Sequence, residues 1–137
     1  RVARWNGTSW APLGGGANGS VYALAVLPGG DVVAGGSFTS GAAIPADSIA
    51  RWDGATWTAI GDSLDGPVSA LTVLANGELV AGGPFTSVSG VAASRIARWD
   101  GSTWSALGSG LDDTVNALVE LPNGDLIAGG QFRFAGG

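Results

Sequence analysis

Three kinds of side chain that could bind a ligand recur in this sequence at a constant spacing of 47 residues. Paired tryptophans could stack on sugar rings, arginines could form an anion-binding ring, and acidic or amide side chains could hold calcium. The tryptophans are Trp5, Trp10, Trp52, Trp57, Trp99 and Trp104, the arginines are Arg4, Arg51 and Arg98, and the oxygen ligands are Asn18, Asp65 and Asp112. Each set also has a structural interpretation.

The exact recurrence favours the structural interpretation of the aromatic and cationic sets. Tryptophans repeated on strands that are covered on both sides are expected to pack between repeats. Phe38, Phe85 and Phe132 recur with the same spacing and are expected to join them. An arginine on such a strand more often pairs with a carboxylate or with backbone carbonyls than with a ligand.

The polar sets fall where turns are expected. Asn6, Asp53 and Asp100 each precede a glycine, a position in which the side chain supports the turn itself. The loop residues Asn18, Asp65 and Asp112 could form a binding site on a rim, but no calcium-loop motif surrounds them. Turn formation or surface solvation is therefore favoured for them.

The composition excludes several kinds of chemistry. The 137 residues include no His, no Cys and no Met. Zinc, copper, haem and iron–sulfur sites depend on His or Cys, as do Ser–His–Asp and Cys–His catalysis and disulfides. We therefore expect a protein that is not an enzyme and that holds no metal and no cofactor.

Charge and hydropathy restrict the partners. The net charge is −5, whereas proteins that bind nucleic acids need clustered positive charge. No apolar run approaches the length that spans a membrane. We expect neither nucleic-acid nor membrane partners, and the Gly-rich, Lys-free composition favours a bacterial protein outside the cytoplasm.

Each repeat is expected to form four strands. In the second repeat these are Val68–Leu74, Glu78–Gly83, Ile96–Trp99 and Thr103–Leu107, of which the first two are joined by an Asn-Gly turn. The stretch Thr86–Arg95, rich in Ser, Gly and Ala, is expected to be a loop. No segment has apolar residues at helical spacing. Both faces of the strands are apolar, so each sheet must be covered on both sides by its copies.

Such an all-β fold of repeated four-stranded antiparallel sheets is typical of β-propeller blades, with flat solenoids as the alternative. The Gly82-Gly83 doublet with Trp99 and Trp104 resembles the kelch repeat of β-propellers. Asp53-Gly-Ala-Thr-Trp57 is similar in part to the Asp-box of sialidase-like propellers, and the period and a Pro-Asn-Gly turn are similar to tachylectin-like lectins. The kelch resemblance implies the blade topology and no function.

The chain divides into a half-blade (1–13), two blades (14–60 and 61–107) and a second half-blade (108–137). Three blades cannot close, because propellers have about four to eight. A homodimer would give six blades and a homotrimer nine, and we expect the dimer. Leu126–Gln131 of one chain would then pair with Val2–Trp5 of the other.

These expectations lead to a scaffold that assembles with itself, whose uniform period is typical of recent duplication or of design. The alternative is a glycan- or protein-binding module that uses the rim with the long loops Thr39–Ser48 and Thr86–Arg95. An enzyme is disfavoured, because kelch-like oxidases imply a copper site with His.

Overall fold

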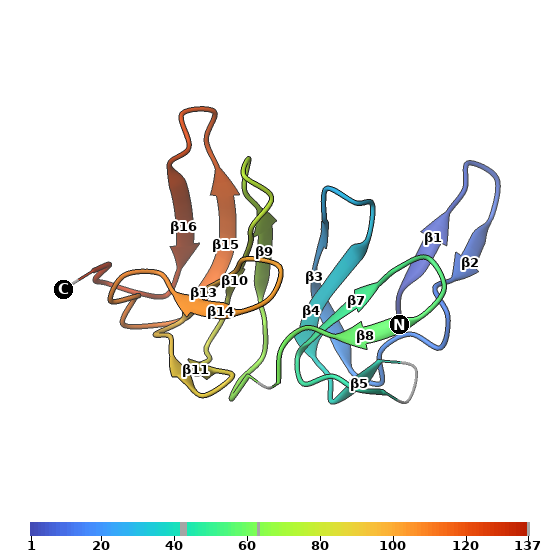
Figure 1. Cartoon of the computed structure of the whole chain (residues 1–137), viewed down its shortest axis with the longest axis horizontal. Helices are drawn as coiled ribbons and strands as arrows, with labels where there is room; N and C mark the ends of the chain where they lie inside the picture. Colours follow the sequence, from blue (N-terminus) through green and yellow to red (C-terminus); the bar gives the residue numbers. More distant parts are fainter. Residues whose placement is uncertain (42–43, 63, 137) are drawn as a thin grey trace.

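The computed structural model describes residues 1–41, 44–62 and 64–136, which form strands and turns (Figure 1). The strands are β1 (Ala3–Trp5), β2 (Trp10–Pro12), β3 (Ser20–Val26), β4 (Val32–Ser37), β5 (Ser40–Gly41), β6 (Ile44–Pro45), β7 (Ile49–Trp52), β8 (Trp57–Ala59), β9 (Ala70–Val73), β10 (Leu79–Gly82), β11 (Ser87–Val88), β12 (Val91–Ala92), β13 (Ile96–Trp99), β14 (Trp104–Ala106), β15 (Val115–Glu120) and β16 (Leu126–Gly130). Within these residues no helix is long and apolar enough to cross a membrane.

Two four-stranded antiparallel sheets form the centre of the chain. One has the order β3-β4-β7-β8 and the other β9-β10-β13-β14, so each is a meander of consecutive long strands. Their registers are equivalent: Ala34 pairs with Ala50 in the first, and Ala81 pairs with Ala97 in the second. The all-β fold of four-stranded blades predicted from the repeat is confirmed.

A two-stranded sheet lies at each end of this row (Figure 1). The β1–β2 hairpin has the register of the last two strands of a blade, because Trp5 pairs with Trp10 as Trp52 pairs with Trp57. The β15–β16 hairpin has the register of the first two strands. Each hairpin therefore has the strand pairing of half a blade.

The structure corrects the expectation that Thr39–Ser48 and Thr86–Arg95 are plain loops. The second contains the short β11–β12 hairpin, in which Val88 pairs with Val91. Its turn is formed by Ser89 and Gly90, both with positive φ. Val88 and Ala93 are fully buried, so burial of small apolar side chains fixes the conformation of a segment whose composition is typical of a loop. The equivalent β5–β6 pair lies in the first segment, where residues 42 and 43 are outside the described residues.

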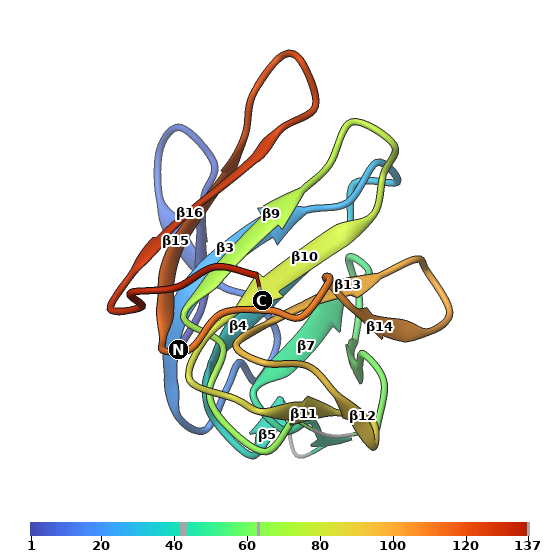
Figure 2. The same ribbon diagram turned by 90° about the vertical axis from the view of Figure 1, so that its left-hand side faces the viewer.

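Apolar clusters lie between successive sheets and hold the row together. The largest joins Val33 and Ile49 of the first blade to Leu79 and other buried residues of the second. Figure 2 views the row from its end, with β3, β9 and β15 side by side. A glycine permits this close approach: a Cβ added to Gly82 of β10 would lie 2.6 Å from a methyl of Val115 in β15. Gly35 of β4 meets Val68 in the same way.

Candidate functional site

Asn18, Asp65 and Asp112, the three residues predicted for a rim site, form hydrogen bonds to a later segment of the same chain. The Asp65 carboxylate accepts hydrogen bonds from the backbone of Thr86 and Ser87 and from the Thr86 hydroxyl. Asn18 bonds the equivalent Thr39 and Ser40, and Asp112 bonds Arg133 and Phe134. Each side chain fixes the start of a blade to the segment that follows the glycine doublet. Among the described residues, no group of three or more acidic side chains could hold a metal ion.

The Asp65 bonds predict a pH-dependent contribution to stability. Burial raises the pKa of Asp65, but the hydrogen bonds from Thr86 and Ser87 outweigh it and lower the pKa from 3.8 to about 2. A lowered folded-state pKa stabilises the folded chain above about pH 4, and this stabilisation is lost as the pH falls towards 2. Asp65→Asn, which copies Asn18, should lower the free energy of unfolding by about 1 kcal/mol or less at pH 7, since the site is solvated. Urea unfolding should show the difference from wild type vanishing near pH 2; a constant difference would contradict it.

The turn residues Asp53 and Asp100 have the structural role expected of them. Asp53 Oδ1 accepts bonds from the amides of Thr56 and Ala55, at 2.7 and 2.8 Å, and these bonds lower the pKa of its carboxyl. Asp100 accepts equivalent bonds from Thr103 and Ser102, which also lower its pKa. Asn6 Oδ1 accepts bonds from Thr8 and Ser9.

Two of the three recurring arginines form ion pairs inside their own blade. Arg51 pairs with Asp31 at 2.6 Å, and Arg98 pairs with Glu78 at 3.4 Å. Arg51 lies on β7 and Arg98 on β13, and each pair joins its strand to the turn before the second strand of the same blade. Arg4 takes part in no ion pair among the described residues. These carboxylates were not among the predicted site residues, although Asp31, Glu78 and Asp125 recur at the same spacing as the arginines.

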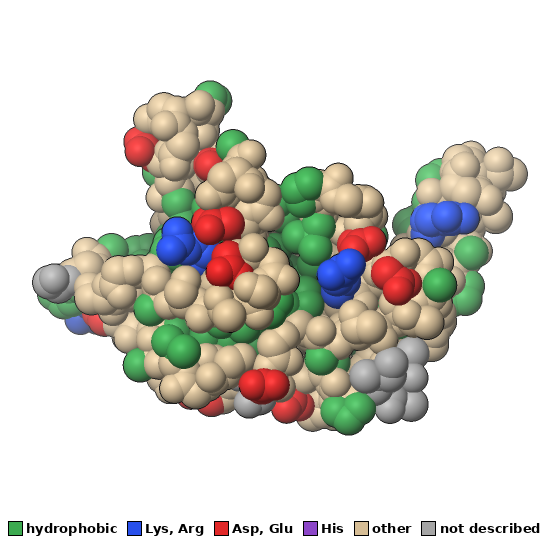
Figure 3. Space-filling model, in the orientation of Figure 1, with side chains coloured by type: hydrophobic (Ala, Val, Ile, Leu, Met, Phe, Trp, Pro, Cys, Tyr) green, Lys and Arg blue, Asp and Glu red, His purple; other side chains and the backbone are tan. Residues whose placement is uncertain are grey.

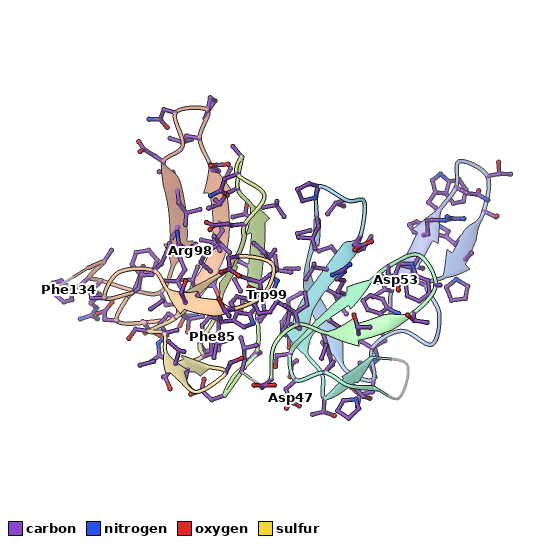
Figure 4. The ribbon with its side chains drawn as sticks, in the orientation of Figure 1. Asp47, Asp53, Phe85, Arg98, Trp99 and Phe134 are labelled. Atoms are coloured by element: carbon purple, nitrogen blue, oxygen red, sulfur yellow. The ribbon has the colours of Figure 1, made fainter. Side chains whose placement is uncertain are left out.

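The tryptophans differ in burial according to their place along the row. Trp57 and Trp104 are buried, with 2% and 5% of their surface exposed, and Trp52 and Trp99 are half-buried. Figure 4 shows Trp99 in the middle of the row, where its ring lines the groove between the two blades. Trp5 and Trp10 are 50% and 69% exposed, which differs from the expectation that all six pack between blades. Within the described residues, no further sheet lies on the outer side of their hairpin.

The expected phenylalanine packing is found at two of its three positions. Phe38 and Phe85 are buried in the clusters that join neighbouring sheets, at 4% and 1% exposure. Phe132 is only half-buried, at the end of the row where the last sheet has one neighbour. Phe134 projects at that end and is 71% exposed (Figure 4).

Both ends of the row are hollowed. Near the C-terminus, a hollow of about 550 Å³ is lined by Leu107, Gly108, Leu126, Ala128 and Phe132, among others. At the opposite end, a hollow of about 660 Å³ separates the β1–β2 hairpin from β3. Leu24 and Val26 line it and are 54% and 61% exposed. Figure 3 shows the notch between this projecting hairpin and the body.

A row of twisted four-stranded antiparallel sheets, packed face to face through small residues and tryptophans, defines a β-propeller. Comparison with protein families supports this class: the model of the Rax2 C-terminal beta propeller domain matches residues 2–105. The chain belongs to this family. Comparisons with curated proteins and with solved structures give no significant match.

Proposed function

We propose that this chain is a non-enzymatic β-propeller scaffold that closes into a ring with a second copy of itself. The single observation that carries the proposal is the complementarity of its two ends. One end has a hairpin paired like strands three and four of a blade, and the other has a hairpin paired like strands one and two. In each hairpin, the strand edge that is paired inside a complete blade, that of β1 or of β16, is unpaired within the described residues. An open edge readily accepts a further strand.

The complete blades supply the register of the proposed junction. Gly35 pairs with Ile49 and Val32 with Trp52 across the middle of the first blade. The same pairing places Val2–Trp5 of one copy against residues 126–129 of the other. Val2 already lies in a buried cluster with residues of the first blade, so the hairpin is held close to its own body.

The surfaces beside this ladder are complementary as well. Gly35 and Gly82 are each covered by a valine and a leucine of the next blade, whereas the equivalent Gly129 meets only Ala117, at 3.9 Å. Leu24, the leucine equivalent to those that cover the first two glycines, is exposed at the other end of the row. Docking would bring Gly129 of one copy to Leu24 of the next and bury both.

Two copies would close six blades, within the usual range of about four to eight, whereas three copies would give nine. The mass in solution tests this. Light scattering over a range of concentrations should give twice the 13.4 kDa of one chain, independent of concentration above the dissociation constant. A stable 13.4 kDa monomer at micromolar concentration would contradict the proposal, and three times that mass would replace the dimer by a trimer.

The second candidate is a glycan- or protein-binding module, which is favoured by the exposed Trp5–Trp10 pair. Their ring centroids are 5.6 Å apart, and both rings face solvent in the single chain. The rim with Asn18, Asp65 and Asp112 supports it less, because these side chains already bind the backbone. A glycan array with wild type and Trp10→Ala separates the candidates: binding that depends on Trp10 would favour the module.

We also propose that the repeat is kelch-like, which its glycine doublet and tryptophans support.

A further inference from the structure

One hydrogen bond repeats between neighbouring sheets, and among the described residues one donor of the series has no acceptor. Trp57 Nε1 donates to the Leu13 carbonyl at 2.9 Å, and Trp104 Nε1 donates to the Ile60 carbonyl at 3.2 Å. Both bonds span 44 residues and link the last strand of one sheet to the chain that leaves the sheet before it. The third donor of this series is Trp10, and the third acceptor is the Leu107 carbonyl. The Leu107 oxygen accepts a bond from the Gly110 amide and has a second lone pair.

The space around Leu107 has the shape that an indole leaves in the rest of the row. A Cβ added to Gly14 would meet Trp52 at 2.7 Å, and one added to Gly61 would meet Trp104 at 2.5 Å. The equivalent Gly108 has no neighbour within 4 Å among the described residues, and it lines the hollow of about 550 Å³. Trp52 and Trp104 are the counterparts of Trp5 and Trp10, so the covered positions indicate that an indole of this pair belongs beside Gly108.

The hairpin that carries Trp10 has the required geometry before any docking. The Trp5 and Trp10 rings lie 5.6 Å apart at 47°, against 5.5 Å and 48° for Trp52 and Trp57 in a complete blade. The half-blade therefore needs no rearrangement of its tryptophans, which lowers the entropic cost of association.

Charge is complementary at the same junction. Arg51 and Arg98 pair with Asp31 and Glu78, which lie directly before the second strand of each blade. The carboxylate equivalent to these two is Asp125, and the equivalent arginine is Arg4. Arg4 has no ion-pair partner within the described part of the chain, and docking of a second copy would bring it to Asp125.

We propose that the hollow beside Gly108 is the seat of the partner's Trp10, whose Nε1 donates to the Leu107 carbonyl while the partner's Arg4 pairs with Asp125. This inference rests on the proposed function and names the groups that recognise the second copy. Trp10 is the anchor that fills the hollow, and the ion pair fixes the register of β1 on β16. The occupant is a second copy of this chain, because the seat matches the β1–β2 hairpin, which pairs like the last two strands of a complete blade.

Trp10 substitutions test the anchor. Trp10→Ala should weaken the dimer by about 30-fold or more in dissociation constant, as expected for a buried aromatic anchor. Trp10→Phe, which keeps a ring but loses the donor, should weaken it by about fivefold. Association of the wild type should move tryptophan emission to shorter wavelength, and this shift should shrink in Trp10→Phe. At a concentration too low for association, denaturant unfolding of the variants should match that of the wild type, because Trp10 is 69% exposed in the single chain.

Charge reversal tests the register. Arg4→Asp or Asp125→Arg alone should weaken the dimer by about tenfold, and both together in one chain should restore most of the affinity. The matched control is the Arg98→Asp and Glu78→Arg pair, which lies within one blade, lines neither end hollow and should leave the dissociation constant unchanged.

The outcomes separate the two proposals. A wild-type dimer whose affinity and emission are unaffected by Trp10→Ala would overturn the anchor and leave the closed ring standing. Reversals at Arg4 and Asp125 that fail to rescue each other would overturn the ion pair. A wild type that stays monomeric at tens of micromolar would overturn the proposed function and, with it, this inference.

Discussion

Trp57→Ala is expected to lower the free energy of unfolding by about 3–5 kcal/mol, the range for a large aromatic lost from a core. Trp57 is 2% exposed, packs in the cluster that joins the N-terminal hairpin to the first blade, and donates to the Leu13 carbonyl. The substitution removes the ring and leaves a buried carbonyl with one bond fewer. Urea unfolding at a protein concentration too low for association measures the effect.

Trp10→Ala is the matched control for this experiment. Trp10 occupies the same place in its repeat but is 69% exposed in the single chain. Its loss should change the unfolding free energy of the monomer by less than about 1 kcal/mol, as for other exposed positions. A change below about 1 kcal/mol for Trp57→Ala as well would show that the inner tryptophan does not hold the sheets together.

Deletion of residues 1–12 should abolish the closed dimer. The deletion removes β1 and β2 but keeps Leu13, whose carbonyl accepts the Trp57 bond. The shared blade then lacks two strands, and the β16 edge and the exposed face of the first blade are left open. Light scattering should show loss of the dimer, with the two remaining blades prone to aggregate. A closed species of unchanged stoichiometry and shape would contradict the cross-chain blade.

The repeat made most of the fold predictable, because a strand pattern read three times is more certain than one read once. Ile96–Trp99 forms β13 with the predicted bounds, and the second strand of the blade ends at its glycine doublet as expected. The glycines recur because a neighbouring valine lies against them, as Val115 lies against Gly82. Periodicity is a signal of such packing, since every repeat meets the same neighbour.

The interactions between blades could not be read in the same way. The bond from Trp104 to the Ile60 carbonyl has a backbone acceptor, and because every residue has a backbone carbonyl, the sequence does not indicate which one accepts. The Arg51–Asp31 pair has a sequence signal, because its carboxylate recurs as Glu78 and Asp125. The two partners lie 20 residues apart, so this recurrence alone does not show that they meet. The exposure of Trp5 and Trp10 depends on what lies beside the chain, which the repeat alone does not state.

Cysteine trapping tests the shared blade most directly, because the chain has no cysteine of its own. Ala34 pairs with Ala50 and Ala81 with Ala97, so Ala128 of one copy should face Ala3 of the other. Opposed residues on antiparallel strands lie about 4.5–5.5 Å apart, within the range that a disulfide spans. Ala34→Cys with Ala50→Cys is the control, which should cross-link within one chain. Oxidised Ala3→Cys with Ala128→Cys should give one denatured species of twice 13.4 kDa without free thiols; a monomer, or a ladder of higher multimers, would contradict the closed two-chain ring.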